Sequence, residues 1–389
     1  MGIRYTEAIV MSFIPFFLLM LAAVVFSTVF TRFQLPWVLA LIVAGVFVGP
    51  FGFDVVEQTQ TLDFLAEMGL IFLMFLAGLQ TNLDSFKHFE RGVATVTVMN
   101  GVIPFAVGVG IGLLFSFSWL AAVLLGVVFM SSAVAVVIPA LEVKGVMKRK
   151  IGHTIVSASV VNDIASLLIL SAILQVFSPA TELPVWSFYI LLVAVLVGLR
   201  YGLPRLRALV PRFRDEQDLF ESEVRIIFAM LFGTVVLFSA LGLHPIIAAF
   251  FSGLILSDSL TSDILLHKLH TIGYGIFIPI FFISIGISTD FSTVTTSVAA
   301  VGLVSAVVFG SVISKFVSGY LAGIWSGFSR NEAAFIGFAT VPQLSTSLAV
   351  VVTATALDLV PVTLLSAIVV LSMVSTVIAP MAMRLIPIK

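Results

Sequence analysis

The sequence contains no cysteine and few charged residues. Of its 389 residues, 10% are Asp, Glu, Lys or Arg, whereas soluble domains carry about 25%. The absence of cysteine excludes disulfide bonds and thiolate metal sites. A formal net charge of −1 gives no support to nucleic-acid binding. With 60% hydrophobic residues and a mean hydropathy of +1.22, the chain reads as an integral membrane protein in the lipid bilayer and not as a soluble enzyme.

Long apolar runs predict an all-α membrane protein with about thirteen transmembrane helices. A helix needs about 20 apolar residues to cross the hydrocarbon core, with a range of roughly 17–25. Cutting the chain at its charged and turn-rich breaks places the spans near 10–30, 36–50, 62–81, 93–115, 118–142, 152–177, 185–203, 223–242, 244–258, 269–288, 297–326, 332–355 and 359–385.

The distribution of basic residues tests this division, because Lys and Arg favour the cytoplasmic side. Alternate connections and the C-terminus hold 17 of the 19 basic residues. The two exceptions are Arg4, near the N-terminus, and Lys315, inside a span. We therefore expect a multi-pass protein of the cell (inner) membrane, with its N-terminus outside and its C-terminus cytoplasmic.

Six helices, a linker helix and six more helices would form an inverted repeat, a design of many secondary transporters. Repeat one would span about 10–177, the linker helix about 185–203 and repeat two about 223–385. The fifth and twelfth helices then correspond, and both carry a polar, helix-breaking stretch, at 130–139 and 339–347. Unwound backbone at membrane depth needs protein or water to satisfy it, so we expect these two broken helices to cross near the midplane.

Two charged residues lie deep inside expected spans, Asp163 on the sixth and Lys315 on the eleventh. A charge at mid-bilayer costs roughly 2.5–3.5 kcal/mol and usually marks a function. One interpretation is a buried ion pair that only holds helices together. The other is a site where Asp163 binds either a cation or a proton, with Lys315 as its charge partner. Burial disfavours the charged form of each group and pairing favours it, so such a site can exchange protons.

Oxygen-bearing side chains near Asp163 suit a hard alkali cation. Ser159 lies one turn before Asp163 on the same helix face, and we expect these two residues to coordinate the ion. Ser131 and Ser132, in the break of the fifth helix, are further candidate ligands, although a membrane-helix Ser can instead bond its own i−4 carbonyl.

Two further groups of polar residues belong to the candidate site. Asn162 precedes Asp163, but it points about 100° away around the helix, so the two side chains cannot face one point, and we expect Asn162 mainly to form an interhelical hydrogen bond. In the second broken helix, the polar residues expected to line the break are Gln343, Ser345 and Thr346.

Several separated motifs resemble the monovalent cation:proton antiporter superfamily over nearly the whole chain. Leu35-Pro36…Ala44-Gly45-Val46-Phe47-Val48-Gly49-Pro50 resembles the family's second-helix signature, and Glu67-Met68-Gly69-Leu70…Phe75-Leu76-Ala77-Gly78-Leu79 its third-helix run. Ser131-Ser132-Ala133-Val134 falls at the family's broken helix. Ala248 to Asp258 and Pro279 to Gly286 resemble two later motifs. Their order and spacing together make the resemblance specific.

The resemblance implies a homodimer in which a mobile core, about 93–177 and 297–385, carries the ion past a scaffold by an elevator-like motion. Asp163 would be the transport carboxylate, preceded by Asn162, and Lys315 the basic residue beside the site. The Asn–Asp pair is typical of electroneutral exchange, whereas Lys at position 315 is commoner in potassium-efflux and electrogenic branches. The transported cation can therefore be either Na⁺ or K⁺. The sequence resembles Kef-type members without their regulatory domain, so no cofactor besides the transported ions is expected.

We therefore expect a secondary-active antiporter that exchanges Na⁺ or K⁺ for H⁺. The alternative is an ion-coupled symporter of an organic anion on a related inverted-repeat fold. A membrane sensor or channel is a third possibility, but neither a selectivity-filter run nor a signalling domain supports it.

Overall fold

The computed structural model describes residues 2–33, 35–80, 91–177, 222–240, 244–257, 262–292 and 297–388, with isolated positions at 187, 190, 193–194, 197–198, 200–202 and 205. Regular structure in these residues is entirely helical. The helices are α1 (Gly2–Arg32), α2 (Trp37–Val48), α3 (Gln60–Gln80), α4 (Arg91–Leu114), α5 (Trp119–Met130), α6 (Val134–Val143), α7 (Lys150–Phe177), α9 (Ser222–Ala240), α10 (Pro245–Ser257), α11 (Asp263–Ile272), the π-helix η2 (Gly273–Phe277), α12 (Ile278–Ile287), α14 (Val298–Trp325), α15 (Arg330–Ala339), α16 (Ser345–Ala356) and α17 (Val362–Leu385).

Eight helical runs in the described part of the chain are long and apolar enough to cross a membrane. The shorter helices α2, α5, α10 and α16 are also apolar. Each expected span other than the seventh coincides with one of these helices or with a consecutive run of them. The seventh, 185–203, falls mostly outside the described residues, so the count of thirteen stays a prediction.

The tenth expected span begins earlier than the sequence indicated. The helical run starts at Asp263, not near 269, and continues through α11, η2 and α12 to Ile287. Ser262 caps its start, where the Ser262 side chain accepts a hydrogen bond from the Leu265 N–H. This N-cap satisfies one of the free donors of the first turn, so the polar residues before position 269 join the helix.

The fifth and twelfth spans are each interrupted. The fifth consists of α5 and α6, separated by Ser131–Ala133, and the twelfth of α15 and α16, separated by residues 340–344. The first interruption is shorter than the expected stretch 130–139. Pro139 lies inside α6, where a membrane helix tolerates proline because neighbouring groups satisfy the freed carbonyl.

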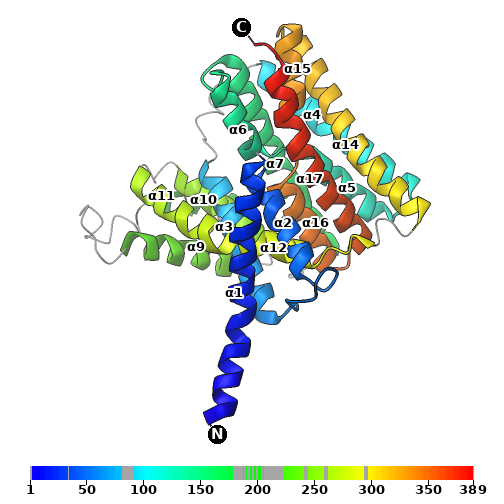
Figure 1. The fold of residues 1–389 in the computed structure, drawn as a ribbon. Helices are drawn as coiled ribbons and strands as arrows, with labels where there is room; N and C mark the ends of the chain where they lie inside the picture. Colours follow the sequence, from blue (N-terminus) through cyan, green and yellow to red (C-terminus); the bar gives the residue numbers. More distant parts are fainter. Residues whose placement is uncertain are drawn as a thin grey trace. The chain divides into compact units, whose positions relative to one another are not determined.

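The described residues divide into two compact units. Unit 1 contains Met1–Gly69, Arg91–Asp163 and Ile276–Lys389, and unit 2 contains Leu70–Glu90 and Ile164–Gly275. Within unit 1, α14 packs against α4, α15 and α17, while α2 packs against α1 and α12 (Figure 1). The predicted division into a core and a scaffold stays a prediction.

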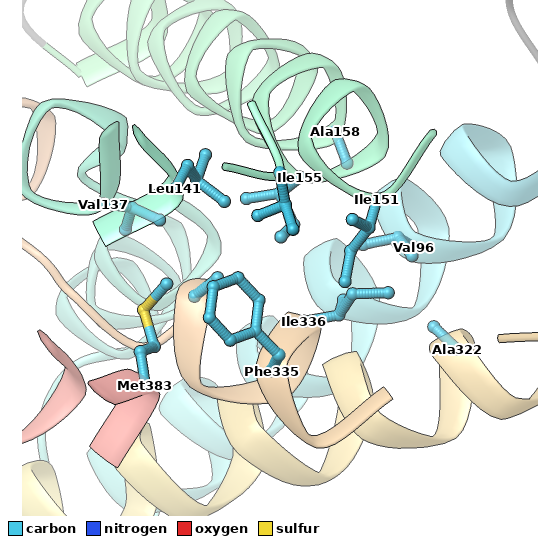
Figure 2. Close-up of a cluster of buried hydrophobic side chains, with 12 residues drawn as sticks. Val96, Val137, Leu141, Ile151, Ile155, Ala158, Ala322, Phe335, Ile336 and Met383 are labelled. Carbon is cyan, nitrogen blue, oxygen red and sulfur yellow. The ribbon is translucent and has the colours of Figure 1, made fainter. Parts of the chain in front are cut away.

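An apolar cluster in unit 1 holds the first turns of α7 against α6, α15 and α17. Ile151 and Ile155 of α7 lie opposite Phe335 of α15, with Val137 of α6 and Met383 of α17 beside them (Figure 2). All five side chains are buried. In a membrane, helices associate largely through such packing and through interhelical hydrogen bonds, so this cluster supports the turns that lead to Asp163.

The helices α2 and α12 meet at two glycines. A Cβ at Gly45 would collide with the Ile283 carbonyl, and a Cβ at Gly286 would collide with the Ile42 carbonyl. Small residues of this kind let membrane helices approach through their backbones. The motifs around Gly45 and Gly286 therefore have a packing reason in this structure.

In unit 2, aromatic side chains pack α3 against α9. The Phe72 ring lies 4.8 Å from the Phe228 ring and 6.3 Å from the Phe232 ring, measured between centroids. Gly78 of α3 and Gly253 of α10 form a second close backbone contact.

Candidate functional site

The two helix breaks of unit 1 contact each other through their backbones. The Ala133 N–H, at the end of the first break, donates to the Pro342 carbonyl of the second at 2.7 Å. Helix α5 ends at Met130 and α15 at Ala339, while α6 begins at Val134 and α16 at Ser345. Carbonyl ends of helices attract cations and amide ends attract anions. The breaks therefore place fixed partial charges of both signs in one region.

Lys315 extends from the middle of α14 into this region and is fully buried. Its ammonium group donates to the Met130 carbonyl at 2.7 Å, to Ser132 Oγ at 2.7 Å and to Asn100 Oδ1 at 3.0 Å. An ammonium has three donors, and these three oxygens match that number. The carbonyl of Met130 belongs to the C-terminal end of α5, which is the favourable end for a positive charge.

Asp163 of α7 faces the same break but is only half-buried. The Ser132 backbone N–H donates to Asp163 Oδ1 at 3.3 Å. The hydroxyl groups of Thr346 and Ser131 lie close to this carboxylate, and the Lys315 ammonium attracts it electrostatically. Thr346 lies in the first turn of α16, where the helix dipole favours a negative charge.

Ser132 connects the two charged residues. Its Oγ accepts a hydrogen bond from Lys315 Nζ and donates one to the Thr340 carbonyl at 3.0 Å, while its backbone N–H donates to Asp163 Oδ1. A hydroxyl has one donor and two acceptor positions, so this arrangement uses the donor and leaves one acceptor position for a further ligand.

Asn100 of α4 is a site residue that the sequence reasoning missed. It is buried, and its amide nitrogen lies 2.9 Å from Ser318 Oγ, 3.0 Å from Thr340 Oγ1 and 3.1 Å from the Lys315 carbonyl. Its carbonyl oxygen accepts from Lys315 Nζ. The signal in the sequence that could have identified it is a lone amide side chain inside the apolar span 93–115.

Gln343 organises the second break. Its side-chain amide donates to Ser311 Oγ at 2.9 Å and to the Phe129 carbonyl at 3.3 Å, and its backbone N–H donates to Ser375 Oγ at 3.1 Å. Ser347 connects this residue to the first break, since Ser347 Oγ lies 3.4 Å from Gln343 Oε1 and 2.8 Å from Ser131 Oγ. Ser345, the first residue of α16, is half-buried.

The structure does not bring two of the expected ligands onto the Asp163 carboxylate. Ser159 is buried one turn earlier on α7, but within the described residues no hydrogen bond joins it to Asp163. Asn162 faces α4, where its Oδ1 lies 3.1 Å from the position a Cβ would take on Gly101. No interhelical hydrogen bond from Asn162 is found within the same part of the chain.

Comparison with known proteins identifies the family. The family model described as "Sodium/hydrogen exchanger, transmembrane" matches residues 18–386. The chain belongs to this family. The resemblance inferred from the sequence motifs is thereby confirmed, and the chain is a multi-pass membrane transporter for cation/proton exchange, not an enzyme.

Similar proteins share most of their length with this sodium/hydrogen exchanger family member. It is 29% identical over 373 residues to "Probable Na(+)/H(+) antiporter 3" of Methanocaldococcus jannaschii, covering 95% of each chain. It is 27% identical to "Na(+)/H(+) antiporter" of Enterococcus hirae, covering 94% of this chain and 96% of the relative. A further relative, at 25% identity over 90% of this chain and 89% of its own length, is "Na(+)/H(+)-K(+) antiporter GerN" of Bacillus cereus. The names of these relatives give no support to the alternative function, an organic-anion symporter.

The fold is similar to that of the sodium proton antiporter MjNhaP1 from Methanocaldococcus jannaschii. The two structures superpose with a TM-score of 0.71, covering 95% of this chain and 94% of the other, at 16% sequence identity. At this identity the match supports the fold alone.

Proposed function

We propose that this protein is a secondary-active antiporter in which a monovalent cation, Na⁺ or K⁺, and a proton compete for the carboxylate of Asp163. The observation that carries the proposal is the position of this carboxylate. It is half-buried, lies beside two helix breaks, and is surrounded by hydroxyl and backbone groups. Carboxylate, hydroxyl and carbonyl oxygens are the ligands of hard cations. Of the predicted ligands, Ser131, Ser132 and Thr346 are closest to Asp163, while Ser159 and Asn162 would reach the ion only after rearrangement.

Lys315 has a supporting role in this mechanism. Its three hydrogen bonds go to neutral oxygens, and two of these belong to Met130 and Asn100 rather than to groups that bind Asp163. We therefore infer that Lys315 keeps its proton through the cycle and balances the partial negative charge at the end of α5. With one carboxylate neutralised by one proton or one cation, exchange is 1:1 and electroneutral.

The protein would move its ion by alternating access. The repeats at about 10–177 and 223–385, joined by the linker helix at 185–203, would form an inverted pair whose broken helices cross at the site. The core at about 93–177 and 297–385 would move against the remaining scaffold in a homodimer. The basic connections would face the cytoplasm.

Proton flux in proteoliposomes tests this function. With an imposed pH gradient, addition of Na⁺ or K⁺ to the wild-type protein should dissipate the gradient, and the ion that does so is the substrate. Asp163→Asn should abolish the response, because an amide cannot exchange a proton for a cation. The matched control is Asp63→Asn, which alters an exposed carboxylate in the first turn of α3 and should leave exchange intact.

Three results would contradict the proposal. Full exchange by the Asp163→Asn variant would show that transport does not need the Asp163 carboxylate. A wild-type protein that responds to no alkali cation would reject the antiporter mechanism itself. A membrane potential that develops during exchange would show that the stoichiometry is not 1:1.

A further inference from the structure

The side chain of Asn100 in α4 contacts Lys315 of α14 at both ends of that residue. Its carbonyl oxygen accepts from Lys315 Nζ at 3.0 Å, while its amide nitrogen donates to the Lys315 backbone carbonyl at 3.1 Å. The two ends of the amide are distinguished chemically, because an ammonium group only donates and must face the oxygen. Both residues are buried, so bulk water does not replace these contacts. One amide therefore fixes both the backbone and the charged end of Lys315.

The hydrogen-bonding capacity of this amide is used completely. Its nitrogen also donates to Ser318 Oγ at 2.9 Å and to Thr340 Oγ1 at 3.0 Å. These two hydroxyls donate in turn to backbone carbonyls, Ser318 to that of Lys315 and Thr340 to that of Gly337. A buried polar network whose members are all satisfied is rigid and specifies one arrangement. The Asn100 oxygen is thus held in the direction of the ammonium.

These contacts close a ring that joins α4, α14 and both helix breaks. Lys315 Nζ donates to Ser132 Oγ in the first break, and Ser132 Oγ donates to the Thr340 carbonyl in the second. The Thr340 hydroxyl accepts from Asn100, whose oxygen accepts from Lys315. Asp163 is not a member of this ring, although the Ser132 backbone N–H donates to its carboxylate. The ring therefore holds the ammonium on neutral oxygens beside the carboxylate.

The Lys315 ammonium has a competing partner in Asp163. The two groups attract each other electrostatically, and a single residue, Ser132, connects them. Lysine carries its charge on a flexible four-carbon stem, so its ammonium can turn towards a carboxylate when a neutral partner is lost. An ammonium bound to the carboxylate would occupy the place of a monovalent cation, and Na⁺ would then have to displace it.

We propose that Asn100 is a positioning residue that sets the cation affinity of the site by keeping the Lys315 ammonium off the Asp163 carboxylate. The amide supplies the third oxygen for an ammonium with three donors, beside the Met130 carbonyl and Ser132 Oγ. Asn100 acts through Lys315 and not on the ion. The inference rests on the proposed competition at Asp163 and adds the group that leaves this carboxylate open to the cation.

The kinetics of cation-driven proton flux in proteoliposomes test this role, with Na⁺ as the probe, or K⁺ if only K⁺ drives the wild type. Asn100→Leu keeps the branched shape of the side chain and removes its oxygen. The ammonium should then turn to Asp163, so the KM for the cation should rise about tenfold or more, the factor expected for one hydrogen bond to a charged group. The maximal rate should change much less, because excess cation displaces the ammonium.

Two comparison variants separate positioning from a general loss of stability. Asn100→Asp keeps an oxygen that accepts from Lys315, and its KM at alkaline pH should not rise, since a charged acceptor holds the ammonium at least as strongly as an amide. Gly286→Ala overpacks the contact of α12 with Ile42 and Gly45 of α2. It should lower the Tm without raising the KM.

A double-mutant cycle shows whether Asn100 acts through the ammonium. Lys315→Met removes the charge and keeps a long side chain. Without an ammonium to restrain, adding Asn100→Leu should leave the KM as it is in Lys315→Met alone. Calorimetric titration of the solubilised variants with the same cation gives this comparison where transport is too slow to measure. Asn100→Ala replaces Asn100→Leu throughout if the larger side chain prevents folding.

The outcomes separate this inference from the proposed function. A normal KM in Asn100→Leu, an equal rise with Lys315 replaced, or a rise in Asn100→Asp would overturn the positioning role and leave the antiporter proposal standing. A wild-type protein that responds to no alkali cation would overturn both. The supporting result is a raised KM in Asn100→Leu that disappears in the Lys315→Met background.

Discussion

Lys315 and Asp163 are connected through one residue, Ser132. Lys315 Nζ donates to Ser132 Oγ at 2.7 Å, and the Ser132 N–H donates to Asp163 Oδ1 at 3.3 Å. The two opposite charges are thus held by one residue of a helix break, and each also contacts the end of a different half-helix. Because the contacts of Lys315 are mainly with neutral groups, its charge can stay in place while the ligand on Asp163 changes.

Loss of Lys315 should destabilise the protein more than loss of the Asp163 charge. Lys315→Ala leaves the buried acceptors Met130 O, Asn100 Oδ1 and Ser132 Oγ without their donor, at a cost of roughly 3 kcal/mol. Asp163→Asn keeps a polar side chain of the same shape at a half-buried position. Thermal unfolding in detergent measures the difference, and a lower Tm for Asp163→Asn than for Lys315→Ala would contradict it.

The hydroxyl of Ser132 should matter more for stability than for cation binding. Ser132→Ala removes a partner of Lys315 and of the Thr340 carbonyl, but it keeps the backbone N–H that contacts Asp163. We expect a loss of about 1–3 kcal/mol in stability, with exchange retained. Ser131→Ala is the comparison variant: it removes another buried hydroxyl of the same break, one that bonds Ser347 and not Lys315, so a larger loss of stability in Ser132→Ala reports the contacts with Lys315 and Thr340. Loss of exchange by Ser132→Ala at an unchanged Tm would instead make Ser132 Oγ a direct cation ligand.

Competition at Asp163 predicts a specific pH dependence of cation affinity. While the carboxylate is mostly protonated, each unit rise in pH removes nine-tenths of the competing protons, so the apparent dissociation constant for the cation should fall about tenfold. The constant should become independent of pH once the carboxylate is mostly ionised. Calorimetric titration with Na⁺ at several pH values measures this slope. A dissociation constant that does not change with pH would exclude competition at one carboxylate.

The glycine contact between α2 and α12 should not tolerate a methyl group. Gly45→Ala and Gly286→Ala each place a Cβ against a backbone carbonyl of the other helix, and overpacking of this kind costs about 1–3 kcal/mol. Gly110→Ala on α4 is the control, because nothing lies within 4 Å of its Cβ position. It should be neutral or slightly stabilising, since Ala is the better helix former. Equal Tm values for the three variants would show that α2 and α12 separate without cost.

Much of this architecture could be predicted from local sequence properties. The spans follow from runs of apolar residues, since each helix must by itself satisfy its backbone in lipid. The positions of the two breaks could be predicted from short polar stretches. The first predicted stretch, 130–139, was too long because it included Pro139, which lies inside α6. The start of the tenth span was placed late because its first residues are polar, and only the cap at Ser262 shows that they are helical.

Only part of the candidate site could be predicted from local sequence properties. Asp163 and Lys315 could be selected from the sequence because a charged residue is rare at the depth of a membrane span, and its type and position alone make it stand out. The partners of Lys315 could not, since Asn100 lies 215 positions away and the Met130 carbonyl carries no side-chain signal at all. Which hydroxyl bonds its own helix and which is left unpartnered also depends on packing between helices. Composition and spacing therefore decided that this chain is a membrane protein with an ionisable centre. Contacts between distant helices, which only close packing in three dimensions selects, decided how that centre is held.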